Sequence, residues 1–417
     1  KYLGSFSPVA RPFATDPAMA PLTIGTDCSG MEAPVQALRN LGVKYEHAFS
    51  CDICKFARAT IEANFPHGVM YEDLTKRDNT TAPAVDIYVA GFPCQPFSSA
   101  GLRQGFADLR GRGTIFFDVR DYIEKKRPKV FVLENVRGLQ SINKGTYFQA
   151  IMESLDKLGG YNITVGLMNT KDHGIPHHRV RTYIVGIRRD VDRGTFSFPE
   201  PIACPPIEQF LERRPQRSFA AHALPPLSQT NARQNVVETK RALRRLGSDP
   251  SEEDVVIDCD STPAFSKWMP GVSPCITCGR SKGHWVTSRG RRFLKTEMMR
   301  LQGMDPTKFK QVVSDRQLGF QVGNAMSVNV LQRLFARLLP AMAPPLSPGA
   351  PPALWEISPE GVHQPAGCAL AGHRLEHLAP EVTGQFFIVK CGVASKGREA
   401  DAAPDEEDPR RQLAKAA

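Results

Sequence analysis

The chain of 417 residues lacks any apolar run near the roughly 18 residues that a membrane-spanning helix needs. Its first 22 residues contain four prolines and no apolar block of the kind found in a secretory signal. Ten cysteines are too few for a disulfide scaffold in a chain of this length, and no internal repeat is visible. These absences predict a soluble, intracellular, globular protein with reduced thiols.

The charge balance favours an acidic partner. Lys and Arg number 53 against 43 Asp and Glu, which gives a net charge of +10. Nucleic acid is one such partner, although a solvated basic surface would have the same composition. Hydrophobic residues at 41% and charged residues at 23% are ordinary globular proportions, which exclude a wholly disordered chain or a coiled coil.

Short apolar runs alternate with amphipathic stretches in the first half of the chain. Strands are predicted at Leu22–Thr26, Tyr45–Ser50, Asp86–Ala90, Lys129–Leu133, Asn162–Leu167 and Thr182–Ile187. Helices are predicted at Ala33–Leu41, Ile53–Asn64, Thr114–Lys125, Tyr147–Leu158, Lys295–Gln302 and Asn329–Leu339. This alternation predicts an α/β domain with a mostly parallel sheet, whose ligands bind at the carboxyl ends of the strands.

Changes in composition divide the chain. Prolines are frequent and periodicity is weak from about 196, which predicts a smaller, loop-rich insertion, and 340–365 has the composition of a linker. The predicted parts are an N-terminal extension (1–21), a catalytic domain (22–195 and 293–339), an inserted region (196–292), and a Pro-rich linker and tail (340–417).

Two strand ends carry side chains suited to catalysis. Gly91-Phe92-Pro93-Cys94-Gln95-Pro96-Phe97-Ser98 follows a predicted strand and enters a glycine-rich loop, which is how nucleophilic thiols are often presented. Another apolar strand ends in Glu134, an acid that could act on a ring attacked by the thiol. A buried core cysteine and a helix-capping acid are the structural alternatives.

Several blocks, taken in order, resemble the cytosine-5 DNA methyltransferases over about 23–339. These are GFPCQPFS, Leu133-Glu134-Asn135-Val136, Leu109–Phe117, His177-His178-Arg179-Val180-Arg181, Glu297–Gly303 and Gln321-Val322-Gly323-Asn324-Ala325. The resemblance implies an S-adenosylmethionine-dependent methyltransferase with a Rossmann-like sheet and a small inserted target-recognition domain, 196–292.

The resemblance also implies a mechanism with base flipping. Cys94 adds to carbon 6 of the flipped cytosine, Glu134 stabilises the protonated nitrogen 3, and carbon 5 takes the methyl group. Arg181 would contact the cytosine oxygen, and Arg179 would support the surroundings of Cys94. His177 stands where glutamine is usual, and we expect it to be tolerated because it can donate or accept a hydrogen bond.

The resemblance also implies S-adenosylmethionine as the cofactor. The turn that would bind it differs from the usual sequence of the family. Cys28 stands where an aromatic residue is common, Glu32 replaces a small residue, and Ser327 replaces proline. Asp52 is placed to meet the ribose hydroxyls and Asp73 the adenine amino group. The implied cofactor residues are Asp27, Cys28, Ser29, Gly30, Met31, Asp52, Ile53, Asp73, Leu74, Gly91, Pro93, Asn324, Ala325 and Met326.

The implied partner is double-stranded DNA. Its predicted contacts are Gln95, Ser98, Arg110, Arg280, Lys282, Arg289, Arg291 and Arg292. The last five form a basic run that could bind phosphates, or a solvated basic face. Two Cys-x-x-Cys pairs, Cys51/Cys54 and Cys275/Cys278, have the spacing of half zinc sites, but we expect buried or incidental thiols and no metal.

Three functions stay open on the sequence alone. The favoured one is an active DNA cytosine-5 methyltransferase, since Cys94, Glu134, Arg179 and Arg181 are all present. The second is a tRNA cytosine-5 methyltransferase with similar blocks. The third is a catalytically silent nucleic-acid-binding scaffold, suggested by the altered cofactor turn. A DNA substrate would place the protein inside the cell, and in the nucleus of a eukaryote.

Overall fold

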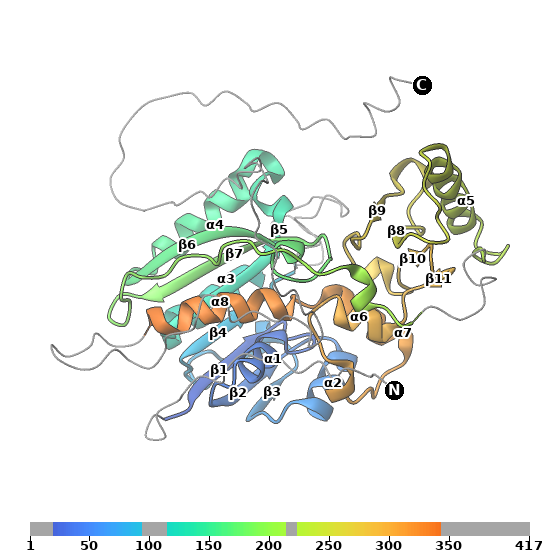
Figure 1. Ribbon diagram of the computed structural model, residues 1–417. Helices are drawn as coiled ribbons and strands as arrows, with labels where there is room; N and C mark the ends of the chain where they lie inside the picture. The colour runs from blue at the N-terminus through green and yellow to red at the C-terminus, as the bar shows by residue number, and fades with distance from the viewer. Residues whose placement is uncertain (1–19, 94–114, 214–222, 343–417) are drawn as a thin grey trace, which may run out of the picture.

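The computed structural model describes residues 20–93, 115–213 and 223–342. Its centre is a seven-stranded sheet in the order β3-β2-β1-β4-β5-β7-β6 (Figure 1). The strands are β1 Leu22–Asp27, β2 Tyr45–Cys51, β3 Val69–Tyr71, β4 Ile87–Ala90, β5 Val130–Val136, β6 Tyr161–Asn169 and β7 Val180–Arg188. All six predicted strands are present, and β3 was missed because its three residues are too few to show a period.

Most neighbours in this sheet are parallel, but β7 runs antiparallel to both β5 and β6. The helices are α1 Ala33–Asn40, α2 Lys55–Asn64, α3 Ile115–Lys126, α4 Thr146–Asp156, α5 Thr230–Arg245, α6 Lys295–Arg300, α7 Asp315–Asn324 and α8 Val328–Ala341. The predicted α/β class is therefore confirmed.

Helices cover both faces of the sheet because the side chains of its central strands alternate between two cores. On β5, Val130 and Val132 pack in the core that includes α1 and α8, whereas Phe131 and Leu133 pack in the core that includes α3 and α4. Strands buried on both faces leave only their ends for polar chemistry. No helix in the described ranges is long and apolar enough to cross a membrane.

A second, smaller sheet lies to one side, in the order β11-β10-β8-β9 (Figure 1). Its strands are β8 Val255–Ile257, β9 Trp268–Pro270, β10 Trp285–Val286 and β11 Arg291–Arg292. We call this sheet with α5 the recognition unit. Its own core joins Val236 of α5 to Ile257 and Trp285.

One helix of this region was not predicted from the sequence. The segment predicted to be loop-rich contains the 16-residue helix α5, whose buried face includes Asn235, Thr239 and Lys240, so polar side chains hid its apolar period. Phe198 and Phe210, which follow the predicted boundary at 196, pack in a large core that also includes Val256 of β8 and Val286 of β10.

Helix α7 was also missed, because it contains Gly319 and Gly323. Both glycines face the backbone of residues 277–281 of the inserted region. A Cβ atom on Gly319 would lie 2.1 Å from the carbonyl oxygen of Ser281, and one on Gly323 would lie 2.3 Å from the carbonyl carbon of Thr277. The helix can pack against this segment only because these positions have no side chain.

Gly319→Ala should therefore destabilise the protein, although alanine is the better helix former by about 1 kcal/mol. We expect a net loss of about 1–3 kcal/mol in the free energy of unfolding, because backbone atoms must move apart. Urea denaturation of the full chain measures this, with Arg316→Ala, at an exposed position of the same helix, as the control. A stabilised Gly319→Ala variant would contradict the close contact.

Candidate active site

The ends of β4 and β5 lie side by side, because Ala90 pairs with Leu133. Gly91 and Glu134 follow these two residues. A Cβ atom on Gly91 would lie 3.7 Å from Oε2 of Glu134 and 2.8 Å from Cε of Met326. The absence of a side chain at Gly91 thus lets three segments of the predicted site meet.

Glu134 is 8% exposed and forms an ion pair with Arg181, whose Nε lies 3.0 Å from its Oε1. The reversed direction of β7 makes this pair possible. In the antiparallel register Val136 lies opposite Arg181, so the beginning of β7 meets the end of β5. The sequence predicted both residues for the site, and the structure brings them together.

Arg179 is buried and binds backbone carbonyl groups. Its guanidinium donates to the carbonyl oxygens of Ile276 at 3.1 Å, Gly323 at 3.2 Å and Ala325 at 2.7 Å. These bonds connect β7 to the inserted region and to the end of α7. Arg179 therefore acts as a structural tie, and its relation to Cys94 lies outside the described residues.

Cys275 is a neighbour of the site that the sequence did not predict as functional. Its Sγ lies 3.8 Å from Nη1 of Arg179 and 3.8 Å from Nη2 of Arg181. Burial raises the pKa of the Cys275 thiol, but the two guanidinium groups outweigh it and hold the pKa below its ordinary value. Nothing in the local sequence signals this contact, because almost a hundred residues separate Cys275 from Arg179.

His177 is fully buried and uses both ring nitrogens. Nδ1 lies 3.0 Å from the carbonyl oxygen of Leu301, and Nε2 accepts the N–H of Ile276 at 3.0 Å. A neutral ring that donates from Nδ1 satisfies both bonds. Burial, with Arg179 beside it, holds the pKa of His177 well below its ordinary value. The expected hydrogen-bonding role for this histidine agrees with these contacts.

The carboxylate of Asp27, one of the predicted cofactor residues, is bound by side chains inside the protein. It is buried in a bidentate pair with Arg77, with both N–O distances 2.6 Å, and it accepts a hydrogen bond from Tyr88. The Arg77 guanidinium also lies 5.0 Å from the ring of Phe49 and 5.0 Å from that of Tyr122. This cluster stabilises the end of β1, so Asp27 positions the turn that follows.

Arg77→Met should cost about 3–5 kcal/mol in the free energy of unfolding, because it leaves the Asp27 carboxylate buried without its partner. Chemical denaturation of the full chain measures the loss. Lys125→Met is the matched control, since its ion pair with Asp121 is surface-exposed and worth less than about 1 kcal/mol. Equal stability of the two variants would contradict the role assigned to the buried pair.

The turn after β1 meets the end of β2 at Asp52. The Asp52 carboxylate accepts the N–H of Gly30 at 2.9 Å and the N–H of Cys54 at 2.8 Å. Burial raises the pKa of Asp52 above its ordinary value, although these bonds act against the rise. The next residue, Ile53, is 79% exposed. A carboxylate beside an exposed apolar side chain is the pair of features that a nucleoside contacts through its ribose and base.

The other predicted cofactor residues surround the same strand ends. Asp73 accepts from the backbone N–H of Thr75 at 3.0 Å and begins a short 3₁₀ helix whose first residue, Leu74, is buried. Asn324 is exposed at the end of α7, whereas Ala325 and Met326 are buried. Cys28, Ser29, Gly30 and Met31 form the turn after β1, and Pro93 is the last described residue after β4.

Two of the three unusual residues of the cofactor site, Glu32 and Ser327, have buried partners. Glu32, with φ of 52°, accepts from Thr26 Oγ1 at 2.7 Å and from Ser50 Oγ at 2.6 Å. The Ser327 hydroxyl lies 2.7 Å from that of Thr170 and donates to Gln302 at 2.9 Å. Both replacements therefore make hydrogen bonds that stabilise the turn and the start of α8.

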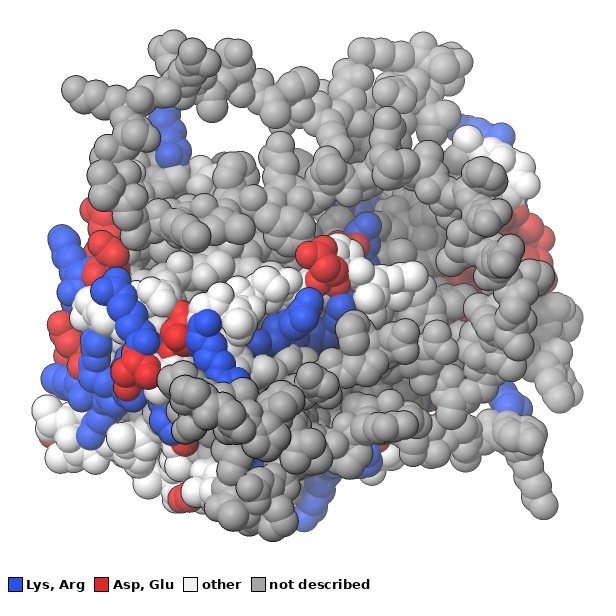
Figure 2. All heavy atoms as spheres, turned by 60° about the vertical axis from the view of Figure 1, so that its left-hand side comes forward, with Lys and Arg blue, Asp and Glu red and all other residues white. Residues whose placement is uncertain are grey.

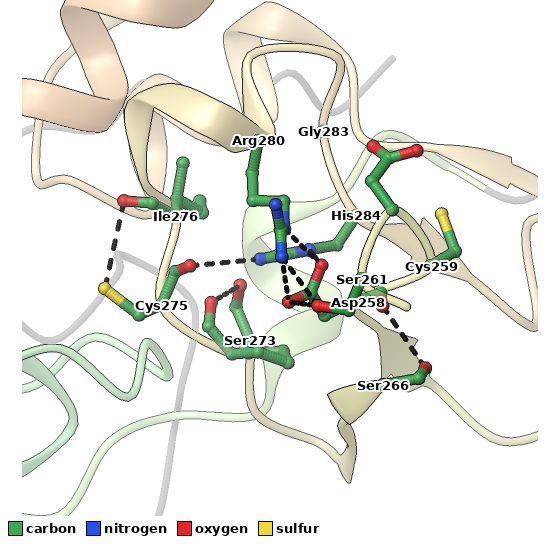
Figure 3. A network of polar contacts seen from close by, with 12 residues as sticks. Asp258, Cys259, Ser261, Ser266, Ser273, Cys275, Ile276, Arg280, Gly283 and His284 are labelled. Carbon is green, nitrogen blue, oxygen red and sulfur yellow. Dashed lines mark hydrogen bonds and ion pairs between the residues drawn. The ribbon is translucent and has the colours of Figure 1, made fainter. Parts of the chain in front are cut away.

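Four arginines of the predicted basic run form ion pairs with carboxylates of the protein. Arg280 pairs with Asp258 (Figure 3), Arg291 with Glu297 and Arg292 with Asp260. Arg289 has a side chain only 1% exposed and pairs with Asp254 at 2.9 Å. A count of charges could not reveal these partners, which lie elsewhere in the chain. Lys282 is exposed.

The surface charges of the described residues are mixed in the same way. Figure 2 shows Lys and Arg side chains beside Asp and Glu on the visible face. Among the residues that the structure describes, no group of three or more His, Cys, Asp or Glu side chains could hold a metal ion. Cys94, Gln95, Ser98 and Arg110 lie outside the described residues.

The order of the large sheet, its antiparallel β7 and the polar site at its strand ends define a Rossmann-like methyltransferase. The family model for C-5 cytosine-specific DNA methylase matches residues 28–339. The chain belongs to this family, and its activity is DNA cytosine-5 methylation.

Curated relatives include Type II methyltransferase M.NgoBI of Neisseria gonorrhoeae, 34% identical over 71% of this chain and 87% of that protein. Type II methyltransferase M.BsuFI of Bacillus subtilis is 42% identical over 68% of this chain and 64% of its own length.

Solved structures with a similar fold include Entamoeba histolytica methyltransferase EhMeth, with a TM-score of 0.55 and 17% identity over 77% of this chain and 98% of that chain. Another is S. pombe Dnmt2 methyltransferase, with a TM-score of 0.52 and 18% identity over 76% of this chain and 99% of the other.

Proposed function

We propose that the protein transfers a methyl group from S-adenosylmethionine to carbon 5 of a cytosine flipped out of duplex DNA, through a covalent adduct with Cys94. One observation supports this most strongly: Glu134, which pairs with Arg181, lies beside Gly91, and Gly91 is three residues before Cys94 in the chain. A carboxyl group paired with a guanidinium thus lies at the end of the strand that precedes Cys94 in the sequence.

The predicted cofactor residues at the ends of β1, β2 and α7 fit S-adenosylmethionine. Asp52 offers carboxylate oxygens at the end of β2, and the exposed Ile53 offers an apolar face for the adenine. Asp73 is the corresponding acceptor for the adenine amino group, and Asn324 lies where α7 ends. When bound, this cofactor supplies an electrophilic methyl group.

The protein's own groups make carbon 5 of cytosine reactive. The Cys94 thiolate forms a bond to carbon 6, while Glu134 holds a proton at nitrogen 3 and Arg181 meets the oxygen on carbon 2, so that the ring can accept the electron pair. After methyl transfer, carbon 5 loses its proton and the electrons of that bond expel the Cys94 thiolate. The enzyme is thereby restored.

Methyl transfer with labelled S-adenosylmethionine tests the proposal. The full chain is incubated with duplex DNA of mixed sequence and, separately, with tRNA, and the digested nucleosides are identified by mass spectrometry. We expect the label in 5-methylcytosine of the DNA. Label confined to tRNA, or present in DNA only on an exocyclic nitrogen, would contradict the proposal.

A duplex that contains 5-fluorocytosine tests the covalent step. Fluorine at carbon 5 cannot leave as a proton does, so the Cys94 adduct should persist. We expect a protein–DNA complex that withstands denaturation and requires the cofactor. If an active enzyme formed no such complex, the thiol adduct would be ruled out.

A further inference from the structure

The loop between β8 and β9, residues 258–267, presents an aromatic ring and a cation to solvent. Phe265 is 75% exposed at the end of a short 3₁₀ helix, and Lys267 is also exposed. A single exposed apolar side chain is common and has little meaning by itself. Phe265 differs from such a residue because its loop is fixed by hydrogen bonds, lies near the active site and carries a cation.

Hydrogen bonds fix the shape of the loop. The Asp258 carboxylate accepts from Ser261 Oγ at 2.8 Å and from Arg280 Nη2 at 3.0 Å (Figure 3). Ser266 Oγ donates to the backbone oxygen of Asp258 at 3.2 Å, and Asn235 of α5 donates to the backbone oxygen of Ser261 at 2.8 Å. These hydrogen bonds fix the loop in one shape, in which Phe265 is exposed to solvent.

The base of the loop lies near Cys275. Asp258 donates its N–H to the carbonyl oxygen of Lys267 at 2.7 Å, and its Oδ1 lies 3.7 Å from Nδ1 of His284. Nε2 of His284 lies 3.3 Å from the carbonyl oxygen of Cys275. Figure 1 shows β9 nearer the large sheet and α5 on the far side. The chain after β9 is tied to the catalytic segment, because Ser273 donates to the carbonyl oxygen of Pro176 and accepts from the N–H of His178, both at 2.8 Å. Ten residues separate Phe265 from Cys275, a span of at most about 35 Å.

Charged side chains from both parts of the molecule lie around His178. Burial lowers the pKa of His178, and the charges of Lys171 and Lys267 lower it further. Lys171 belongs to the catalytic domain and Lys267 to the recognition unit. Lys171 also lies 3.7 Å from the carboxylate of Asp172, whose charge raises the pKa of His178. A duplex entering the active site would pass Lys267.

We propose that Phe265 and Lys267 form the DNA-contacting tip of the recognition unit, with Lys267 on a backbone phosphate and Phe265 packed against bases near the flipped cytosine. The proposal rests on the proposed function, since its ligand is the duplex substrate. Flipping leaves neighbouring bases without a stacking partner, and an aromatic side chain can supply one. The rigid loop lowers the entropic cost of that contact.

Binding of a fluorescein-labelled duplex to the full chain tests the proposal. Anisotropy titrations at several salt concentrations compare wild type with Phe265→Ala and Lys267→Ala. Leu246→Ala is the matched control for the aromatic residue, because it is 54% exposed at the C-terminal end of α5. Lys308→Ala is the control for the cation, because its side chain is 63% exposed on a different surface segment. Thermal melting checks the folding of each variant.

We expect Phe265→Ala to weaken binding by about 10-fold or more, in line with the loss of one stacked aromatic contact. Lys267→Ala should lower the slope of log K against log salt by about 0.9, the value for one phosphate contact. Both controls should match wild type. The proposal is overturned if the two variants bind as the controls do, or if they weaken binding of tRNA but not of duplex DNA.

The same samples separate this proposal from the proposed function. If wild type methylates duplex DNA and Phe265→Ala and Lys267→Ala bind that duplex as tightly as wild type, only the loop contact is wrong. If wild type neither binds nor methylates duplex DNA, both are wrong. If wild type binds duplex DNA and both variants bind it more weakly, but no methyl group is transferred, the loop contact is supported and the proposed reaction is wrong.

Discussion

Replacing Cys94 by alanine should reduce methyl transfer to duplex DNA by at least about 10⁴-fold, because removal of a catalytic nucleophile leaves only binding and electrostatic contributions. Without the bond from sulfur to carbon 6, carbon 5 of cytosine stays a poor nucleophile. Single-turnover transfer of labelled methyl groups at saturating DNA measures this loss. The complex with 5-fluorocytosine DNA should disappear in the same variant.

Cys204→Ser is the matched control, because Cys204 is a partly exposed thiol that has no place in the proposed chemistry. It should keep wild-type rates. DNA affinity of Cys94→Ala should change little, which separates loss of chemistry from loss of binding. Measurable turnover by a correctly folded Cys94→Ala enzyme would remove the thiol from the mechanism.

Glu134→Gln should lower the rate of the chemical step by about 10²–10⁴-fold, the usual range for a lost proton-transfer group. Glutamine has nearly the same shape and keeps an oxygen for Arg181, whose Nε lies 3.0 Å from the Glu134 carboxylate. It cannot share a proton with nitrogen 3 of the cytosine. The fold and the cofactor affinity should therefore persist while the rate falls.

Single-turnover kinetics with saturating duplex DNA measures the effect. Glu153→Gln on α4 is the control, since Glu153 pairs with Gln149 on the surface. A fall in DNA affinity that accounts for the whole loss would assign Glu134 to binding rather than to catalysis. An unchanged rate would remove it from the site altogether.

Local pattern was enough to predict most of the large sheet. Its strands are buried on both faces and read as apolar runs, so their limits could be predicted to within a few residues. The blocks around Glu134 and Arg181 also predicted two side chains that the structure brings together. Patterns of this kind are visible because the residues that form them are close in sequence.

Partnerships between distant residues could not be predicted in this way. The sequence does not show that Arg289 and Arg292 pair with Asp254 and Asp260. It does not show either that Arg77 lies against the carboxylate of Asp27. A charged residue looks the same in sequence whether its partner is solvent, DNA or another side chain.

The sequence by itself determined the α/β class, the catalytic blocks and the family, since each depends on short-range pattern and order along the chain. The tertiary structure alone decided that β7 runs antiparallel and delivers Arg181 to Glu134. It also decided that Gly319 and Gly323 admit the backbone of residues 277–281, and that Phe265 rather than the arginine run is exposed on the recognition unit. Tertiary packing decides which distant groups are buried together. In that low-dielectric interior a charged or polar group must pair with another group because it has lost its hydration.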